Sequence, residues 1–156
     1  MKIIDIPNYG KLEIEHIVLD YNGTLASGGK VQEKTKEVLK KLCKEYKVYV
    51  ITADTFGTVK EELKEFNLEV IVLKSDNHTQ EKADFVKSLD VNKTVAISNG
   101  NNDSLMLQSA LLSIAIIGNE GCSAKTLLAS DITCTNITDA LNLLLNTKAL
   151  IATLRK

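Results

Sequence analysis

The chain has 156 residues, of which 44% are hydrophobic and 25% charged, so we expect one folded domain covering residues 1–156. Its formal net charge is −1, which argues against a broad basic surface for nucleic acid or an anionic membrane. No apolar run approaches the roughly 20 residues that span a bilayer, and the N-terminus lacks the apolar core of a secretory signal. We therefore expect a cytoplasmic protein without a nucleic-acid or membrane partner.

The first predicted element is a β-hairpin. Residues 2–6 and 11–15 alternate between apolar and polar side chains, and the turn residues 7–10 (Pro-Asn-Tyr-Gly) lie between them. The second strand continues into residues 16–19, an apolar stretch that ends at Asp20. Continuous apolar strands are typical of a parallel sheet that is covered on both faces.

Helices and strands alternate along the rest of the chain. Helical periodicity around Leu39 is followed by predicted strands at 48–51, 70–73, 94–97, 113–117 and 132–134. Predicted helices cover 58–66, 80–89, a segment starting near 103, 124–129, and one or two segments between 138 and 154. This alternation predicts an α/β protein with a doubly wound, mostly parallel, Rossmann-like sheet and helices on both faces.

In such sheets ligands bind at the carboxyl ends of the strands, which directs attention to Asp20, Thr52 and Asn99. Asp20 is followed at once by the turn sequence Tyr-Asn-Gly-Thr, whose backbone N–H groups could surround an anion. A carboxylate in that position can attack phosphorus. The same residue types also form ordinary turns and helix caps, and the stretch alone does not decide between these interpretations.

Four segments, in order, resemble the motifs of the haloacid dehalogenase (HAD) superfamily. Residues 20–25 (Asp-Tyr-Asn-Gly-Thr-Leu) resemble the first motif, and residues 48–54, an apolar strand ending in Thr52, resemble the second. Lys82 resembles the lysine of the third motif, and residues 98–103 (Ser-Asn-Gly-Asn-Asn-Asp) resemble the fourth. The segment from residue 120 to the C-terminus is similar to the soluble P-type ATPase-like phosphatases of this superfamily.

The resemblance implies a role for each of these residues. Asp20 would accept the phosphoryl group, while Thr52 and Lys82 would bind its oxygens and offset their charge. We expect the whole phosphate site to comprise Asn22, Gly23, Thr24, Thr52, Ala53 and Lys82. Mg²⁺ would be held by Asp20, the backbone carbonyl of Asn22 and Asn99, with Asp103 orienting Lys82 or a metal-bound water.

Ordinary structural roles remain open for several of these residues. Thr52 could be a strand residue that caps the next helix, and Lys82 could be a solvated helix lysine. Asp103 could be an acidic residue favoured by a helix N-terminus. We interpret His16 and His78 as structural or solvent-facing. The cysteines, Cys43, Cys122 and Cys134, have no spacing suited to zinc, and we expect free thiols.

Two amides depart from the superfamily pattern. Asn22 stands where phosphatases of this type carry a second carboxylate, which protonates the leaving group and then activates water. An amide cannot transfer a proton, and general acid–base catalysis is worth roughly 10²–10⁴-fold. Asn99 stands where the pattern has a metal-binding Asp, so fewer charges face the ion. The soluble P-type ATPase-like group shares both features.

The loop at 26–32 is short and nothing long separates Thr52 from Lys82, so we expect a minimal cap or none. An open site suits a large phosphorylated substrate or a partner subunit, and the apolar segment 141–145 makes a homo-oligomer one option. It could equally pack on its own sheet. Two functions remain: a slow Mg²⁺-dependent phosphatase acting through an aspartyl phosphate, or a weakly catalytic phosphate-binding or phosphoacceptor module.

Overall fold

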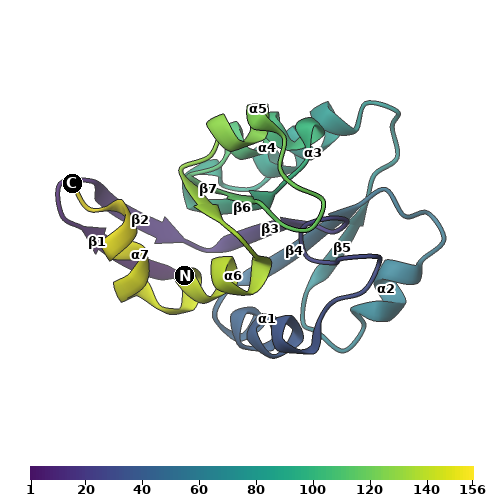
Figure 1. Cartoon of the computed structure of the whole chain (residues 1–156), viewed down its shortest axis with the longest axis horizontal. Coiled ribbons are helices and arrows are strands. Elements are labelled where there is room, and N and C mark those ends of the chain that lie inside the picture. Colours follow the sequence, from purple (N-terminus) through teal and green to yellow (C-terminus); the bar gives the residue numbers. More distant parts are fainter.

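The computed structural model describes all of residues 1–156, which form a central sheet between two layers of helices and a projecting hairpin (Figure 1). The six strands of the sheet are parallel and lie in the order β5-β4-β3-β6-β7-β8. They are β3 (His16–Asp20), β4 (Lys47–Thr52), β5 (Glu69–Val72), β6 (Thr94–Ser98), β7 (Leu112–Ile116) and β8 (Ile132–Cys134). The predicted parallel, doubly wound α/β architecture is confirmed.

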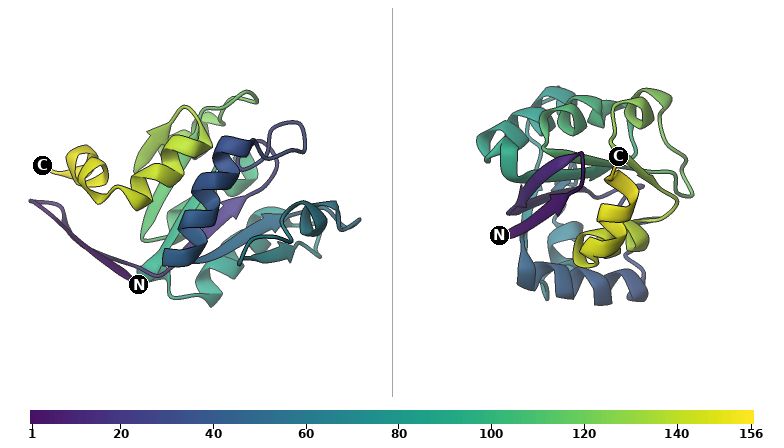
Figure 2. Two further views of the ribbon diagram at one scale, coloured as in Figure 1. Left: turned by 90° about the horizontal axis from the view of Figure 1, so that it is seen from below. Right: turned by 90° about the vertical axis from the view of Figure 1, so that its left-hand side faces the viewer.

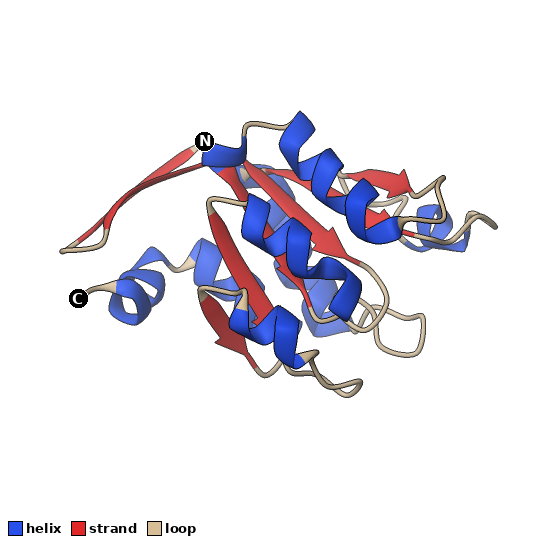
Figure 3. Ribbon diagram, turned by 90° about the horizontal axis from the view of Figure 1, so that it is seen from above, coloured by secondary structure: helices blue, strands red, loops and turns tan.

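Helices cover both faces of the sheet (Figures 1 and 3). One face carries α1 (Glu33–Glu45), α2 (Thr58–Glu62) and α6 (Ile137–Leu145); the other carries α3 (His78–Ser88), α4 (Ser104–Ser109) and α5 (Ala124–Leu128). Ile17 and Leu19 of β3 pack into the core on the α1 side, and Val18 packs into the core on the α3 side. Alternate residues thus face opposite layers, which explains why the three central residues of β3, Ile17 to Leu19, are all apolar.

The expected N-terminal hairpin is also confirmed. Strands β1 (Lys2–Ile6) and β2 (Gly10–Ile14) pair antiparallel and project away from the sheet, as Figure 2 shows. The C-terminal helix α7 (Thr147–Leu154) lies against this hairpin, and its Leu150 and Leu154 share a core with Ile4. The apolar side of α7 therefore packs on its own chain. The apolar segment 141–145 lies in α6 and also packs into the core, through Leu141 and Leu144.

Several helix boundaries differ from the predictions, and asparagine side chains that cap the helices set two of them. Helix α3 begins at His78 and not near residue 80, because the Asn77 side chain accepts a hydrogen bond from the Gln80 N–H (3.2 Å). Asn146 separates α6 from α7 and caps the second helix in the same way, so the tail contains two helices. Helix α2 ends at Glu62, four residues earlier than expected.

Strand order reverses between β3 and β6. The chain moves outward from β3 through β4 to β5 and then returns to place β6 on the other side of β3. The carboxyl ends of β3 and β6 thus flank the crevice where ligands bind in open α/β sheets. No inserted domain covers this crevice, because only short loops and the elements α2 and β5 lie between β4 and α3. None of the helices has the length and apolar character needed to cross a membrane.

Candidate active site

The sheet brings the expected residues to one edge. Asp20 is the last residue of β3, Thr52 is the last residue of β4, and Asn99 directly follows β6. The side chains are buried, with exposed fractions of 8% for Asp20, 2% for Thr52 and 8% for Asn99. Polar groups in such positions lose hydration, so they are stable only when they are hydrogen-bonded or serve a ligand.

Lys82 links two of the carboxylates. From the first turn and a half of α3, its Nζ donates to Oδ1 of Asp20 (2.7 Å) and to Oδ1 of Asp103 (2.6 Å). The second oxygen of Asp103 accepts hydrogen bonds from the Ser98 hydroxyl and from the Gly100 N–H (2.9 Å). Asp103 is thus fully engaged in holding Lys82 and the loop, which fits the expected orienting role better than direct contact with a metal.

Burial and charge act in opposite directions on this chain of ionic groups. Burial raises the pKa of Asp20 to about 6; the negative charge of Asp103 adds to this effect and the charge of Lys82 opposes it. Burial disfavours the ammonium of Lys82, but attraction to Asp20 and Asp103 outweighs it, so the pKa of Lys82 is raised. The lysine therefore remains a fixed positive charge beside Asp20, where it could offset the charge of a bound anion.

The turn after Asp20 is held by its own hydrogen bonds. The N–H of Gly23 donates to the carbonyl of Ala26 (2.9 Å) and that of Thr24 to the carbonyl of Tyr21 (3.3 Å). The expectation that Gly23 and Thr24 bind phosphate through these groups does not fit this arrangement. The hydroxyl of Thr24 instead contacts Oδ2 of Asp20 (3.3 Å) and Oδ1 of Asn99 (3.1 Å), which fixes both side chains.

Two other backbone N–H groups are available for an anion. Those of Asn22 and Ala53 have no hydrogen-bond acceptor, and both residues line a cleft of about 380 Å³ that also contains Asp20 and Lys82. Thr52 lines the same cleft, and its hydroxyl oxygen accepts from the Asp54 N–H (3.0 Å), so its proton is free to be donated. Lys82, Thr52, Asn22 and Ala53 together could bind a phosphoryl group beside Asp20.

Three ionisable residues of this cleft, His78, Glu120 and Cys122, were not expected there from the sequence. His78 is half-buried at the start of α3, four residues before Lys82 and on the same helix face. This spacing is the one sequence signal that could have identified it, and its half-buried position agrees with the interpretation of His78 as structural or solvent-facing. Glu120 reaches the cleft from the loop after β7. His16, by contrast, lies at the other end of β3 and packs against Tyr49.

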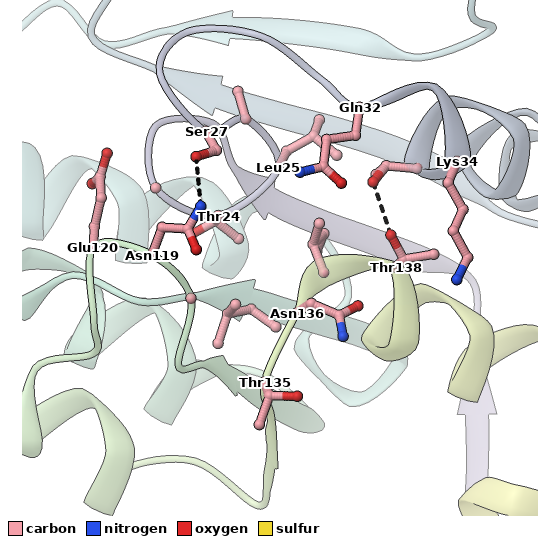
Figure 4. A pocket seen from close by; sticks show the side chains of 16 residues that line it. Thr24, Leu25, Ser27, Gln32, Lys34, Asn119, Glu120, Thr135, Asn136 and Thr138 are labelled. Carbon is pink, nitrogen blue, oxygen red and sulfur yellow. Dashed lines mark hydrogen bonds between the residues drawn. The ribbon is translucent and has the colours of Figure 1, made fainter.

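Figure 4 shows a second cleft, of about 300 Å³, which shares Glu120 with the first. Gln32 and Lys34 line it from the start of α1, and Asn136 and Thr138 line it from the start of α6. Glu120 stands at the end remote from Lys34 and belongs to both clefts. The second cleft is lined mainly by amides and hydroxyls and contains neither Asp20 nor Lys82.

Sequence comparisons connect the chain to two proteins of Methanocaldococcus jannaschii. No protein-family model matches the chain. The uncharacterised protein MJ0073 is 56% identical over 63 residues, which are 40% of this chain and 68% of that protein. The chain belongs to the family of MJ0073. The uncharacterised protein MJ0072 is 46% identical over 39 residues, which are 25% of this chain and 89% of that protein.

Comparison with solved structures identifies the fold. The 3-deoxy-D-manno-octulosonate 8-phosphate phosphatase of Moraxella catarrhalis, crystallised with magnesium, phosphate and KDO, superposes with a TM-score of 0.71 at 20% identity over 90% of this chain and 92% of that chain. The corresponding phosphatase of Haemophilus influenzae gives 0.72 at 12% identity over 88% and 90%. A putative HAD subfamily IIIA hydrolase of Legionella pneumophila gives 0.70 at 14% identity over 90% and 86%. The chain therefore has the HAD fold.

Proposed function

We propose that residues 1–156 form one HAD-type domain that acts as a Mg²⁺-dependent phosphatase, with an aspartyl phosphate on Asp20 as intermediate. The observation that carries this proposal is the buried chain Asp20–Lys82–Asp103 at the carboxyl ends of the central strands. A structural ion pair would need neither an adjacent cleft nor unpaired N–H groups at its edge. Here both are present.

The chemistry begins with attack by a carboxylate oxygen of Asp20 on phosphorus. The bond between phosphorus and the leaving oxygen breaks as the new bond forms, and that oxygen takes its proton from water because Asn22 cannot supply one. Lys82 and the Thr52 hydroxyl offset the charge on the phosphoryl oxygens. Water then attacks the aspartyl phosphate, releasing phosphate and regenerating Asp20. Substrates with good leaving groups, such as aryl or acyl phosphates, suffer least from the amide at position 22.

The oxygen donors in the cleft fit a hard divalent cation. The backbone carbonyl of Asn22 accepts no hydrogen bond, and Asp20 and Asn99 contribute side-chain oxygens to the same cleft. Carboxylate and carbonyl oxygens are the ligands that Mg²⁺ prefers, and the bound ion would offset phosphoryl charge. The magnesium and phosphate crystallised with the Moraxella catarrhalis phosphatase support this assignment.

A second candidate function is a phosphoacceptor or phosphate-binding module with little turnover. It is favoured by the amides Asn22 and Asn99 and by the absence of any group of three or more His, Cys, Asp or Glu residues arranged to hold a metal. The same amides support the narrower resemblance to the soluble P-type ATPase-like group. In either case the partner is a phosphorylated molecule, small or macromolecular, because no cap limits its size.

One experiment separates these functions. The wild type and Asp20→Asn are incubated with p-nitrophenyl phosphate or acetyl phosphate, with and without Mg²⁺, while released phosphate and intact protein mass are followed. Mg²⁺-dependent turnover that Asp20→Asn lacks supports the phosphatase. A stable gain of one phosphoryl group without turnover supports the phosphoacceptor. A wild type with neither turnover nor a mass gain would exclude both the phosphatase and the phosphoacceptor, and would leave phosphate binding without transfer.

A further inference from the structure

The cleft around Asp20 contains several oxygen donors, but most of them are neutral or are already hydrogen-bonded within the protein. Asn22 and Asn99 are neutral, and both oxygens of Asp103 are engaged by Lys82, Ser98 and the Gly100 N–H. Asp20 thus remains as the one expected carboxylate able to face a cation. Since divalent-cation affinity depends strongly on the number of charged ligands, such a site would bind Mg²⁺ weakly.

Glu120 is a further carboxylate of the same cleft. Its side chain is exposed and makes no hydrogen bond or ion pair within the chain. A Cβ on Gly23 would overlap Oε2 of Glu120 and would lie 2.9 Å from Nδ2 of Asn99. The carboxylate of Glu120 and the amide of Asn99 therefore approach each other at Gly23. The preceding residue, Asn22, is the one whose backbone carbonyl we propose as a metal ligand.

The position of Glu120 is fixed by its loop. A turn from Gly118 to Gly121 closes with a 2.9 Å hydrogen bond between the Gly121 N–H and the Gly118 carbonyl. Asn99 ties this turn to the end of β6, because its Nδ2 donates to the Gly121 carbonyl (3.3 Å) and its carbonyl accepts from the Ser123 N–H (2.9 Å). The neighbouring Asn119 contacts Ser27 in the loop after β3, as Figure 4 shows. The backbone thus presents Glu120 at the junction of two catalytic loops.

We propose that Glu120 supplies the second negative charge of the divalent-cation site, directly or through a metal-bound water, in place of the charge that Asn99 lacks. An Asp at position 99 would place two carboxylates against each other at Gly23, so an amide at 99 and a carboxylate at 120 form a compatible pair. This inference rests on the proposed function because it assumes a cation bound at Asp20. It adds a residue to the site that the motif pattern does not contain.

The test measures Mn²⁺ binding by electron paramagnetic resonance of the free ion, which requires no turnover, with Mg²⁺ as competitor. Glu120→Gln is expected to weaken Mn²⁺ binding about tenfold or more, because altered carboxylates near a metal typically cost 10- to 100-fold. Glu65→Gln is the matched control, since Glu65 is an exposed, unpaired carboxylate outside the cleft, and it should bind as the wild type does. The exchanged variant Asn99→Asp/Glu120→Gln should recover most of the affinity.

The outcomes separate this inference from the proposed function. If Asp20→Asn loses Mn²⁺ while Glu120→Gln stays within threefold of the wild type, Glu120 has no role at the ion, and the phosphatase proposal is unaffected. If the exchanged variant binds as weakly as Glu120→Gln, the charge is not interchangeable between positions 99 and 120, and the inference also fails. If the wild type binds no Mn²⁺, or Asp20→Asn binds it equally well, both this inference and the metal site of the proposed function are overturned.

Discussion

The Nζ atom of Lys82 lies 2.7 Å from Oδ1 of Asp20, although the two residues are 62 positions apart in the chain. The contact joins the end of the central strand β3 to the first turns of α3, and both side chains are buried. Lys82 is the single cation between two buried carboxylates, so its removal leaves Asp20 and Asp103 uncompensated, which is more costly than the ion pairs themselves are stabilising. If the proposed phosphatase mechanism holds, the contact ties catalysis and stability to the same residues.

Lys82→Met is expected to abolish phosphate release and to lower the free energy of unfolding by about 3–5 kcal/mol, because Asp20 and Asp103 would then face each other without a cation. Urea denaturation and phosphate-release assays measure the two effects. Lys87→Met, an exposed lysine on the same helix, should leave both unchanged. Equal stability of the two variants would show that the buried lysine is dispensable to the fold. Adding Asp103→Asn to Lys82→Met should recover part of the lost stability but no activity.

Asp20 should destabilise the metal-free protein at neutral pH. Burial raises its pKa in the folded state to about 6, against about 4 in an unfolded chain. The folded protein thus holds the proton more tightly, so the stability that this group contributes is fully present below about pH 4 and is lost as pH rises through about 6. Asp20→Asn should therefore be more stable than the wild type at pH 7, by on the order of 1–3 kcal/mol.

The measurement is urea denaturation in metal-free buffer at several values between pH 4 and pH 7. The stability difference between Asp20→Asn and the wild type should shrink toward the lower pH. Asp76→Asn, which removes an exposed carboxylate near the start of α3, is measured in parallel as the control for the loss of a carboxylate at the surface. A difference that is constant with pH would contradict the raised pKa of Asp20.

Most of what could be predicted about the fold and the site came from the apolar pattern of the strands. Continuous apolar runs such as 16–19 require cover on both faces, so the parallel sheet and the shared edge of Asp20, Thr52 and Asn99 followed from the sequence. Helix ends were less predictable, because caps such as Asn77 act through single hydrogen bonds that compete with other turn geometries.

The contribution of Glu120 to the cleft could not be predicted in the same way. It depends on how the loop after β7 folds back onto residues 22–27 and on the turn at 118–121, and neither leaves a periodic pattern. Which N–H groups of the turn after Asp20 are available to a ligand could not be predicted either. Residue types predicted an anion-binding turn, but the observed hydrogen bonds engage Gly23 and Thr24 internally and leave Asn22 available.

Gly23 is required for two separable reasons. Its φ of +76° lies in the left-handed region, where a side chain costs about 1–2 kcal/mol, and a Cβ would also overlap Glu120 and crowd Asn99. Gly28, with φ of +59°, has no atom within 4 Å of the place that a Cβ would occupy. Gly28→Ala therefore measures the cost of the left-handed backbone conformation alone. Gly23→Ala should therefore lower the free energy of unfolding by about 1–3 kcal/mol more than Gly28→Ala, measured by urea denaturation. Equal losses would show that the crowding at Gly23 is relieved without cost.

Asn22→Asp should increase phosphatase turnover about tenfold or more, because a carboxylate at this position can protonate the leaving group and then activate water. The gain should be larger for alkyl than for aryl phosphates, since alkoxides depend most on protonation as they leave. Rates with both substrate types at saturating Mg²⁺ measure this ratio. Asn102→Asp is the matched control: it places the same charge on an exposed amide of the same cleft, where no leaving-group contact is expected. An equal gain in both variants would mean that added negative charge, and not proton transfer at position 22, limits the rate.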